Sequence, residues 1–274
     1  MATPLPTPGE YSSRIARPPF PWRAWLAGLV VLAILVWSAA GTASSAGDFF
    51  TGLPQMGLYF QRLTPWGGVG WPLEYLPKVA GSLLETIKLS LASTSVGALL
   101  ALLFALVGSR PLAGSRAAYN TWRGLLNLVR TVPDLVLASL AVAAFGLGAL
   151  PGWITLVIFS FGVIAKLLAD TIETADTGTL EAITAVGGTR LQKGVFAVLP
   201  QIAPDYIAYS LYAFEINIRV AVVLGLVGAG GIGQILYRDI NLLRYGHVGL
   251  IIAVTFVAVM LTDWLSTFWR SRLG

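Results

Sequence analysis

Six apolar runs, separated by shorter polar or glycine-rich segments, form the dominant pattern along this 274-residue chain. The runs are Trp25–Ala40, Leu89–Val107, Leu135–Leu150, Trp153–Ala169, Ile207–Val227 and Val248–Leu265. An α-helix of about 20 apolar residues crosses the ~30 Å hydrocarbon core of a bilayer, and helices satisfy their backbone groups internally. The pattern therefore predicts an all-α integral membrane protein with six transmembrane helices.

The N-terminal region divides into a polar tail and the first apolar run. Residues 1–21 contain six prolines and few apolar residues, which predicts a disordered cytoplasmic tail. Residues 22–40 form the first predicted transmembrane helix. The basic residues before this run and the small residues after it also fit a cleaved signal peptide, which stays open as an alternative.

Residues 41–81 read as an external loop. Their apolar side chains recur every three or four positions, which makes one helical stripe: Phe49, Leu53, Met56, Phe60 and Leu63. This stripe predicts a helix lying in the membrane interface, and packing against the first span is the alternative.

Residues 82–274 hold the other five predicted helices, and the polar segment 171–200 interrupts them. This segment runs from Thr171 to Pro200 between two apolar flanks, and it contains Glu181-Ala182, Gly187 and a closing Leu199-Pro200. The spacing predicts a helix, a glycine turn and a second helix on the membrane surface, a shape that can dock a partner.

Charge decides which side each segment faces. With the N-terminus inside, eleven Lys and Arg residues fall in inside segments and four fall in outside segments: Arg62, Lys78, Arg238 and Arg244. Loops rich in Lys and Arg stay in the cytoplasm. Both termini and segment 171–200 are therefore predicted to be cytoplasmic, and the net charge of +5 reflects topology rather than nucleic-acid binding.

Composition excludes several kinds of chemistry. The chain is 56% hydrophobic and 11% charged, with no cysteine and with His247 as its one histidine. Disulfides and thiolate metal sites are excluded, and neither a metal site nor a catalytic relay is predicted. No G-x-x-x-x-G-K-[ST] sequence occurs, so ATP would not bind here through a P-loop. Energy for active transport would have to enter through another subunit.

Two further patterns lie near the predicted fifth span. Gly228, Gly230, Gly231 and Gly233 match G-x-G-x-x-G, but they follow a membrane span rather than a β-strand. We therefore reject dinucleotide binding and expect a flexible turn or re-entrant segment, with simple helix termination as the alternative.

The second pattern consists of Glu215, Asn217 and Arg219, which lie within the fifth span. Glu215 and Arg219 are four residues apart and can pair on one helix face. Ionisable groups inside a span usually face a pathway or another charge. A translocation pathway or gate whose arginine meets an anion, and a structural salt bridge, are both compatible with this pattern.

The residues above resemble the permease subunits of binding-protein-dependent ABC importers, specifically the phosphonate type. EAITAVG in segment 171–200 is similar to the EAA–G loop, although Ile183 and Ala197 depart from the usual pattern. RTVPDLVLA at 130–138 and FEINIRVAVVLGLVGAGGIGQ at 214–234 resemble blocks of the phosphonate-type subfamily. The resemblance runs from about residue 72 to the end of the chain.

This resemblance implies a type I importer permease fold, a homodimer, two ATP-binding subunits that carry ATP and Mg, and an external phosphonate-binding protein. It implies transport of a phosphonate, phosphite, hypophosphite or phosphate ion. The coupling residues would be Glu181, Ala182, Gly187 and Gly188.

The resemblance also places Glu215, Asn217 and Arg219 on the pathway, and Gly228, Gly230, Gly231 and Gly233 in an outer gate or loop. The main rival is a secondary transporter or channel that works without an ATPase. A membrane enzyme is a third and weaker alternative.

Overall fold

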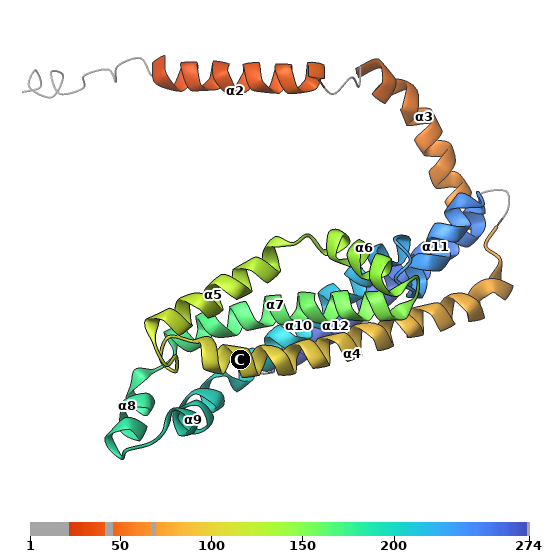
Figure 1. Cartoon of the computed structure of the whole chain (residues 1–274). Coiled ribbons are helices and arrows are strands. Elements are labelled where there is room, and N and C mark those ends of the chain that lie inside the picture. The colour runs from red at the N-terminus through yellow and green to blue at the C-terminus, as the bar shows by residue number, and fades with distance from the viewer. Residues whose placement is uncertain (1–21, 42–45, 67–69, 273–274) are drawn as a thin grey trace, which may run out of the picture. The chain divides into compact units, whose positions relative to one another are not determined.

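The computed structural model describes residues 22–41, 46–66 and 70–272, and no strand occurs among them (Figure 1). The predicted disordered tail at 1–21 lies outside the described residues. The chain divides into two units, Met1–Leu58 and Tyr59–Gly274. The all-α prediction is confirmed for the described part of the chain.

Helices follow one another with short connections. In chain order they are α2 (Trp22–Gly41), α3 (Ala46–Leu63), the short helix η1 (Leu73–Tyr75), α4 (Leu76–Gly108), α5 (Arg116–Thr131), α6 (Asp134–Phe145), α7 (Ala149–Thr174), α8 (Thr177–Ala185), α9 (Arg190–Gln192), the π-helix η2 (Lys193–Val198), α10 (Leu199–Leu226), α11 (Gly231–Asn241) and α12 (Tyr245–Arg270).

Helix α2 lies in the first unit, and its side chains from Trp22 to Ala40 are exposed on every face. A helix that is apolar all round is stable when lipid surrounds it, so α2 fits the predicted first span. Helix α3 begins in the first unit and ends in the second. There the Leu63 carbonyl accepts a hydrogen bond from the Trp71 indole at 2.8 Å. The interfacial position predicted for this segment stays a prediction.

Five helical stretches are long and apolar enough to cross a membrane: Trp22–Ala40, Leu73–Gly108, Ala149–Thr174, Arg190–Asn241 and Tyr245–Arg270. The pair α5 and α6 makes a sixth if it is counted as one span, but it is bent by 83°. The six predicted spans thus reappear with one of them broken.

The predicted third span, Leu135–Leu150, is shorter than expected. Helix α6 ends at Phe145, and Gly146 and Gly148 turn the chain with φ of +83° and +142°. Pro151 and Gly152, a pair typical of turns, lie instead in the first turn of α7. Proline is tolerated there because its missing N–H would have no intrahelical partner.

Helix α5 occupies a segment whose arginines predict a polar loop. Ser115 caps its start, because the hydroxyl accepts a hydrogen bond from the Ala118 N–H at 3.1 Å. Arg123 on α5 pairs with Asp170 and Glu173 on α7, each at 2.8 Å. These cross-helix ion pairs stabilise an amphipathic helix. Its buried and half-buried apolar side chains recur every three or four residues, at Ala118, Trp122, Leu126 and Val129, but the helix is too polar to appear among the six apolar runs.

The centre of the second unit is the packing of α4, α7 and α10, which run alongside one another (Figure 1). Small residues allow the close approach: a Cβ on Gly97 of α4 would lie 2.6 Å from Ser160 Cβ on α7. In membranes, small residues at helix contacts allow the dense van der Waals packing that holds helices together. The packing therefore fixes the position of α10, which carries the predicted site residues Glu215, Asn217 and Arg219.

Candidate coupling loop and translocation residues

Helix α8 presents the predicted coupling residues to solvent. Asp176 caps the helix by accepting a hydrogen bond from the Gly178 N–H at 3.0 Å. Leu180 is buried against the core, whereas Glu181 and Ala182 are exposed, and Val186 after the helix is 84% exposed. The loop therefore has one face fixed to the bundle and one face free to meet another protein.

The turn after α8 is a Schellman motif. The Gly187 N–H donates to the Thr184 carbonyl at 3.0 Å, and the Gly188 N–H donates to the Ile183 carbonyl at 2.9 Å. Gly187 has φ of +79°, a conformation that L side chains rarely adopt. The predicted glycine turn between two helices is present.

Gln201 holds α8 against α10, a role that the sequence does not predict. Its Nε2 donates to the Thr179 hydroxyl at 2.6 Å, and its Oε1 accepts from the Asp176 N–H at 3.0 Å. The residue lies just after the Leu199-Pro200 pair. Its position directly after Leu199-Pro200 could have drawn attention to it. A single glutamine in a helix, however, belongs to no residue pattern that predicts a role in anchoring another helix.

Helix α9 is the second arm of the loop. Thr189 and Gln192 form a capping box, in which the Thr189 N–H donates to Gln192 Oε1 at 2.7 Å. Arg190 donates to the Gly114 carbonyl at 3.4 Å, which connects α9 to the segment that follows α4. Both arms of the loop are thereby attached to the bundle.

The predicted Glu215–Arg219 pair is present, and it belongs to a larger ion network. Arg219 Nη2 lies 2.6 Å from Glu215 Oε1 and 2.7 Å from Asp263 Oδ2 on α12. Arg270, also on α12, lies 3.1 Å from Glu215 Oε2. Two cations and two carboxylates thus neutralise one another and connect α10 to α12.

Asn217 points to a different side of α10 and is fully buried. Its Nδ2 donates to Thr94 Oγ1 on α4 at 2.7 Å and to Ser160 Oγ on α7 at 2.6 Å. The structure therefore does not bring Asn217 together with Glu215 and Arg219. It places Asn217 at the contact of three helices.

The glycine segment forms a tight, buried turn between α10 and α11. Gly228, Gly230 and Gly231 have φ of +89°, +84° and +69°. Gly230, Gly231 and Gly233 are buried, and a Cβ on Gly233 would collide with the Val222 carbonyl of α10. A tight turn that ends α10 and begins α11 occupies this position, as the helix-termination alternative predicts. The flexible or re-entrant segment stays a prediction.

Metal binding has no support among residues 22–41, 46–66 and 70–272. No group of three or more His, Asp or Glu side chains there is close enough to hold an ion.

Comparison with known families gives a match over most of this bundle. The family model described as "Binding-protein-dependent transport system inner membrane component" matches residues 93–273. The matched part includes the coupling loop, the ion network and the glycine turn, and it lies outside the first unit.

Two similar proteins carry names from phosphorus transport. The phosphate-import permease protein PhnE of Mycolicibacterium smegmatis is 39% identical over 189 residues, which are 69% of this chain and 36% of that protein. The phosphite transport system permease protein PtxC of Stutzerimonas stutzeri is 38% identical over 190 residues, 69% of each chain. This chain therefore spans only about a third of the first relative's length.

The fold is similar to that of solved importer structures. A chain of the MetNI methionine ABC transporter, in an inward-facing conformation, matches with a TM-score of 0.62 at 21% identity, and the match covers 74% of this chain and 98% of that one. A chain of an amino acid ABC transporter matches with a TM-score of 0.60 at 22% identity, covering 73% and 96%. The type I importer permease fold is confirmed by these likenesses.

Proposed function

We propose that this chain, which belongs to the family of binding-protein-dependent transport system inner membrane components, is the permease of an ATP-driven importer of phosphorus oxyanions. The single observation that carries the transport mechanism is the loop of α8 and α9, whose outer face is exposed while Gln201 and Leu180 hold its inner face. The cargo class rests on the names of the relatives, phosphate and phosphite permeases at 38–39% identity.

Energy would enter through this loop. Glu181 and Ala182 lie on the exposed face, and the turn at Gly187 and Gly188 directs the chain into α9. An ATP-binding subunit seated against that face would push on α10 through the hydrogen bonds of Gln201. In this proposal ATP and Mg bind to two such subunits, and two copies of this chain form the membrane part.

The ion network would act as a brace rather than as an anion site. Arg219 already has two carboxylate partners, so a passing oxyanion would have to compete with Glu215 and Asp263. We assign to the network the role of keeping α12 in register with α10 while α10 moves. The buried turn at Gly230, Gly231 and Gly233 fits a closed outer gate better than a surface for the external binding protein.

A direct test is the ATPase activity of the complex in lipid nanodiscs. The chain is co-expressed with its ATP-binding subunit, and ATP hydrolysis is measured with the external binding protein empty or loaded with methylphosphonate. We expect the loaded protein to stimulate hydrolysis in the wild type, and Glu181→Lys to abolish the stimulation because it reverses the charge on the docking face.

The rival reading, a secondary transporter or channel, predicts the opposite. It would be supported if no ATP-binding subunit co-purifies and if an ion gradient alone drives methylphosphonate into proteoliposomes.

A further inference from the structure

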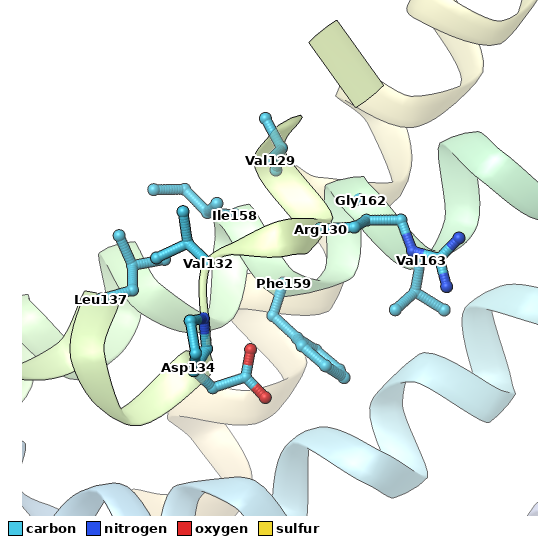
Figure 2. Close-up of a pocket in the computed structure, with 10 residues that line it drawn as sticks. Val129, Arg130, Val132, Asp134, Leu137, Ile158, Phe159, Gly162 and Val163 are labelled. Atoms are coloured by element: carbon cyan, nitrogen blue, oxygen red, sulfur yellow. The ribbon is translucent and has the colours of Figure 1, made fainter. Parts of the chain in front are cut away.

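A cavity of about 250 Å³ lies where α5 and α6 meet at their 83° bend, against one side of α7. Figure 2 shows it with Arg130, Asp134 and Phe159 among the lining side chains. Arg130 is the last residue but one of α5 and Asp134 is the first residue of α6, with Thr131, Val132 and Pro133 between them. Neither the coupling loop nor the ion network contributes a residue to this cavity.

The cavity lies near the middle of the bundle. The α7 residues that line it fall between Ile158 and Val163, close to the centre of a helix that runs from Ala149 to Thr174. Ser160, within that stretch, bonds to Asn217 of α10 at the three-helix contact. The charge count of the sequence groups Arg130 with the cytoplasmic segments, but its contact with Gly162 near the middle of α7 places it deeper, away from the interfaces where long charged side chains usually find water.

Arg130 is held at the cavity by its aliphatic stem. Gly162 of α7 lies beneath this stem, and a Cβ on Gly162 would be 3.2 Å from Arg130 Cγ. Within the described part of the chain, neither Arg130 nor Asp134 has an ion pair or a side-chain hydrogen bond. Arg123, by contrast, is paired with two carboxylates.

Arg130 is exposed and Asp134 is half-buried in the single chain. In a membrane, an unpaired cation and an unpaired carboxylate at this depth are costly unless water or a ligand reaches them. Charged groups within membrane spans usually face water or a substrate path, and broken helices at membrane depth occur where they line a cavity. Substrate sites of membrane transporters are often built at such broken helices. Both features meet at the α5–α6 bend.

We propose that this cavity is a substrate site on the permease and that it takes a phosphorus oxyanion that still carries a proton. Arg130 donates hydrogen bonds to the anionic oxygens, and the ionised carboxylate of Asp134 accepts the hydrogen bond of the P–OH group. A carboxylate accepts but does not donate, so a fully deprotonated anion such as sulfate would be repelled. The assignment rests on the proposed transport function and adds a permease-level selectivity to it.

Cysteine protection tests the site without relying on transport. The chain has no cysteine, so Val132→Cys introduces a single thiol at the cavity wall. The purified complex, without binding protein and in a maltoside detergent that contains no phosphate, is treated with a thiol reagent. We expect millimolar methylphosphonate to slow the modification about threefold or more while sulfate does not, since only the phosphonate can satisfy Asp134.

The phosphate of a lipid headgroup could occupy the cavity through the same contacts as a free phosphorus oxyanion. If vesicles of phosphatidylglycerol slow the modification and free methylphosphonate does not, the cavity is a lipid site and the proposal is wrong. Equal protection by methylphosphonate and sulfate would also overturn the role of Asp134.

Uptake by proteoliposomes gives the second readout. Arg130→Gln should reduce methylphosphonate uptake about tenfold or more, and Arg130→Lys should restore part of it because the charge remains while the forked geometry is lost. Asp134→Asn should narrow the preference for methylphosphonate over sulfate. The matched control is Arg116→Gln, an exposed arginine at the other end of α5, which should leave uptake unchanged.

The two proposals fail in different ways. If the wild-type complex shows no ATPase stimulation by loaded binding protein, the transport function is wrong. If stimulation is present but Arg130→Gln transports as well as the wild type, only the cavity assignment is wrong.

Discussion

Gly187 and Gly188 occupy consecutive positions after α8, but different constraints require a glycine at each. Gly187 has φ of +79°, and a Cβ at that position would meet open space, so its backbone conformation alone excludes most side chains. At Gly188 a Cβ would collide with Ile183. The turn that separates α8 from α9 is therefore set by conformation at one residue and by contact at the next.

This difference predicts a graded response at Gly187. Asparagine tolerates the left-handed conformation and should support uptake close to wild type. Valine should cost about 1–3 kcal/mol, because a β-branched residue is strained there, and should lower binding-protein-stimulated ATPase activity. Both variants are measured in nanodiscs at equal amounts of complex. Equal activity of the asparagine and valine variants would contradict a conformational role.

The charged residues of α10 show which contacts residue spacing can predict and which it cannot. Glu215 and Arg219 are four apart, and their pairing follows from helix geometry. Asp263 and Arg270 are 44 and 55 residues from their partners on α10, so nothing in the sequence connects them. The sequence alone therefore leaves Arg219 free to bind an anion. The fold gives it a second carboxylate partner, Asp263.

At the scale of elements, α8 and α10 behave as one unit because a single side chain joins them twice. Gln201 uses its donor on Thr179 and its acceptor on the Asp176 N–H. Helix α8 has nine residues, too short to be stable alone in water. Its position depends on these two bonds and on the burial of Leu180.

Removing the anchor should uncouple the loop from the bundle. We expect Gln201→Ala to leave the complex assembled but to reduce the binding-protein-stimulated part of ATP hydrolysis several-fold, because both hydrogen bonds are lost. Gln201→Glu keeps the oxygen that accepts from the Asp176 N–H but loses the Nε2 donor. Its stimulated ATPase activity should therefore lie between those of the wild type and Gln201→Ala. The control is Gln61→Ala, an exposed glutamine on α3. Full stimulation in Gln201→Ala would show that packing alone holds α8.

Elements differ in how well the sequence predicts them. Helices α7, α10 and α12 can be predicted directly from their long apolar runs, because a stretch of that length and composition is typical of a membrane-spanning helix. Helix α5 is not among the six apolar runs because Arg116 and Arg123 make it too polar to span a membrane alone, and ion pairs with acids on α7 contribute to its stability. Its amphipathic period, Trp122, Leu126 and Val129, is a signal that a search for continuous apolar runs overlooks. Pro133 indicates the start of α6.

At the scale of the whole molecule, the property that charge alone predicts is orientation. Arg244 and Arg270 lie at opposite ends of α12, a helix of 26 residues that is about 39 Å long. The uneven distribution of Lys and Arg predicts that the C-terminal end and the coupling loop face the cytoplasm.

Reporter fusions test that orientation. Green fluorescent protein joined after Gly274 should fluoresce, and alkaline phosphatase joined there should be inactive. Alkaline phosphatase joined after Leu243, between α11 and α12, should be active. The reverse pattern would place the coupling loop outside and would remove the basis for an ATP-driven mechanism.

The π-helix Lys193–Val198 makes the position of the coupling loop a matter of residue count. A π segment holds one residue more than the α-helical turn it replaces, and such segments often occur at functional sites. Each residue of an α-helix turns the chain by about 100°. Deleting Ala197 would therefore turn the π segment into an ordinary α-helical turn and leave α8 and α9 facing nearly the same way. Deleting one residue from the α-helical part of α10 beyond it would instead swing α8 and α9 about a quarter of a circle around the axis of α10. The same one-codon difference, with no change in charge or polarity, is thus absorbed at one place and reorients the loop at another.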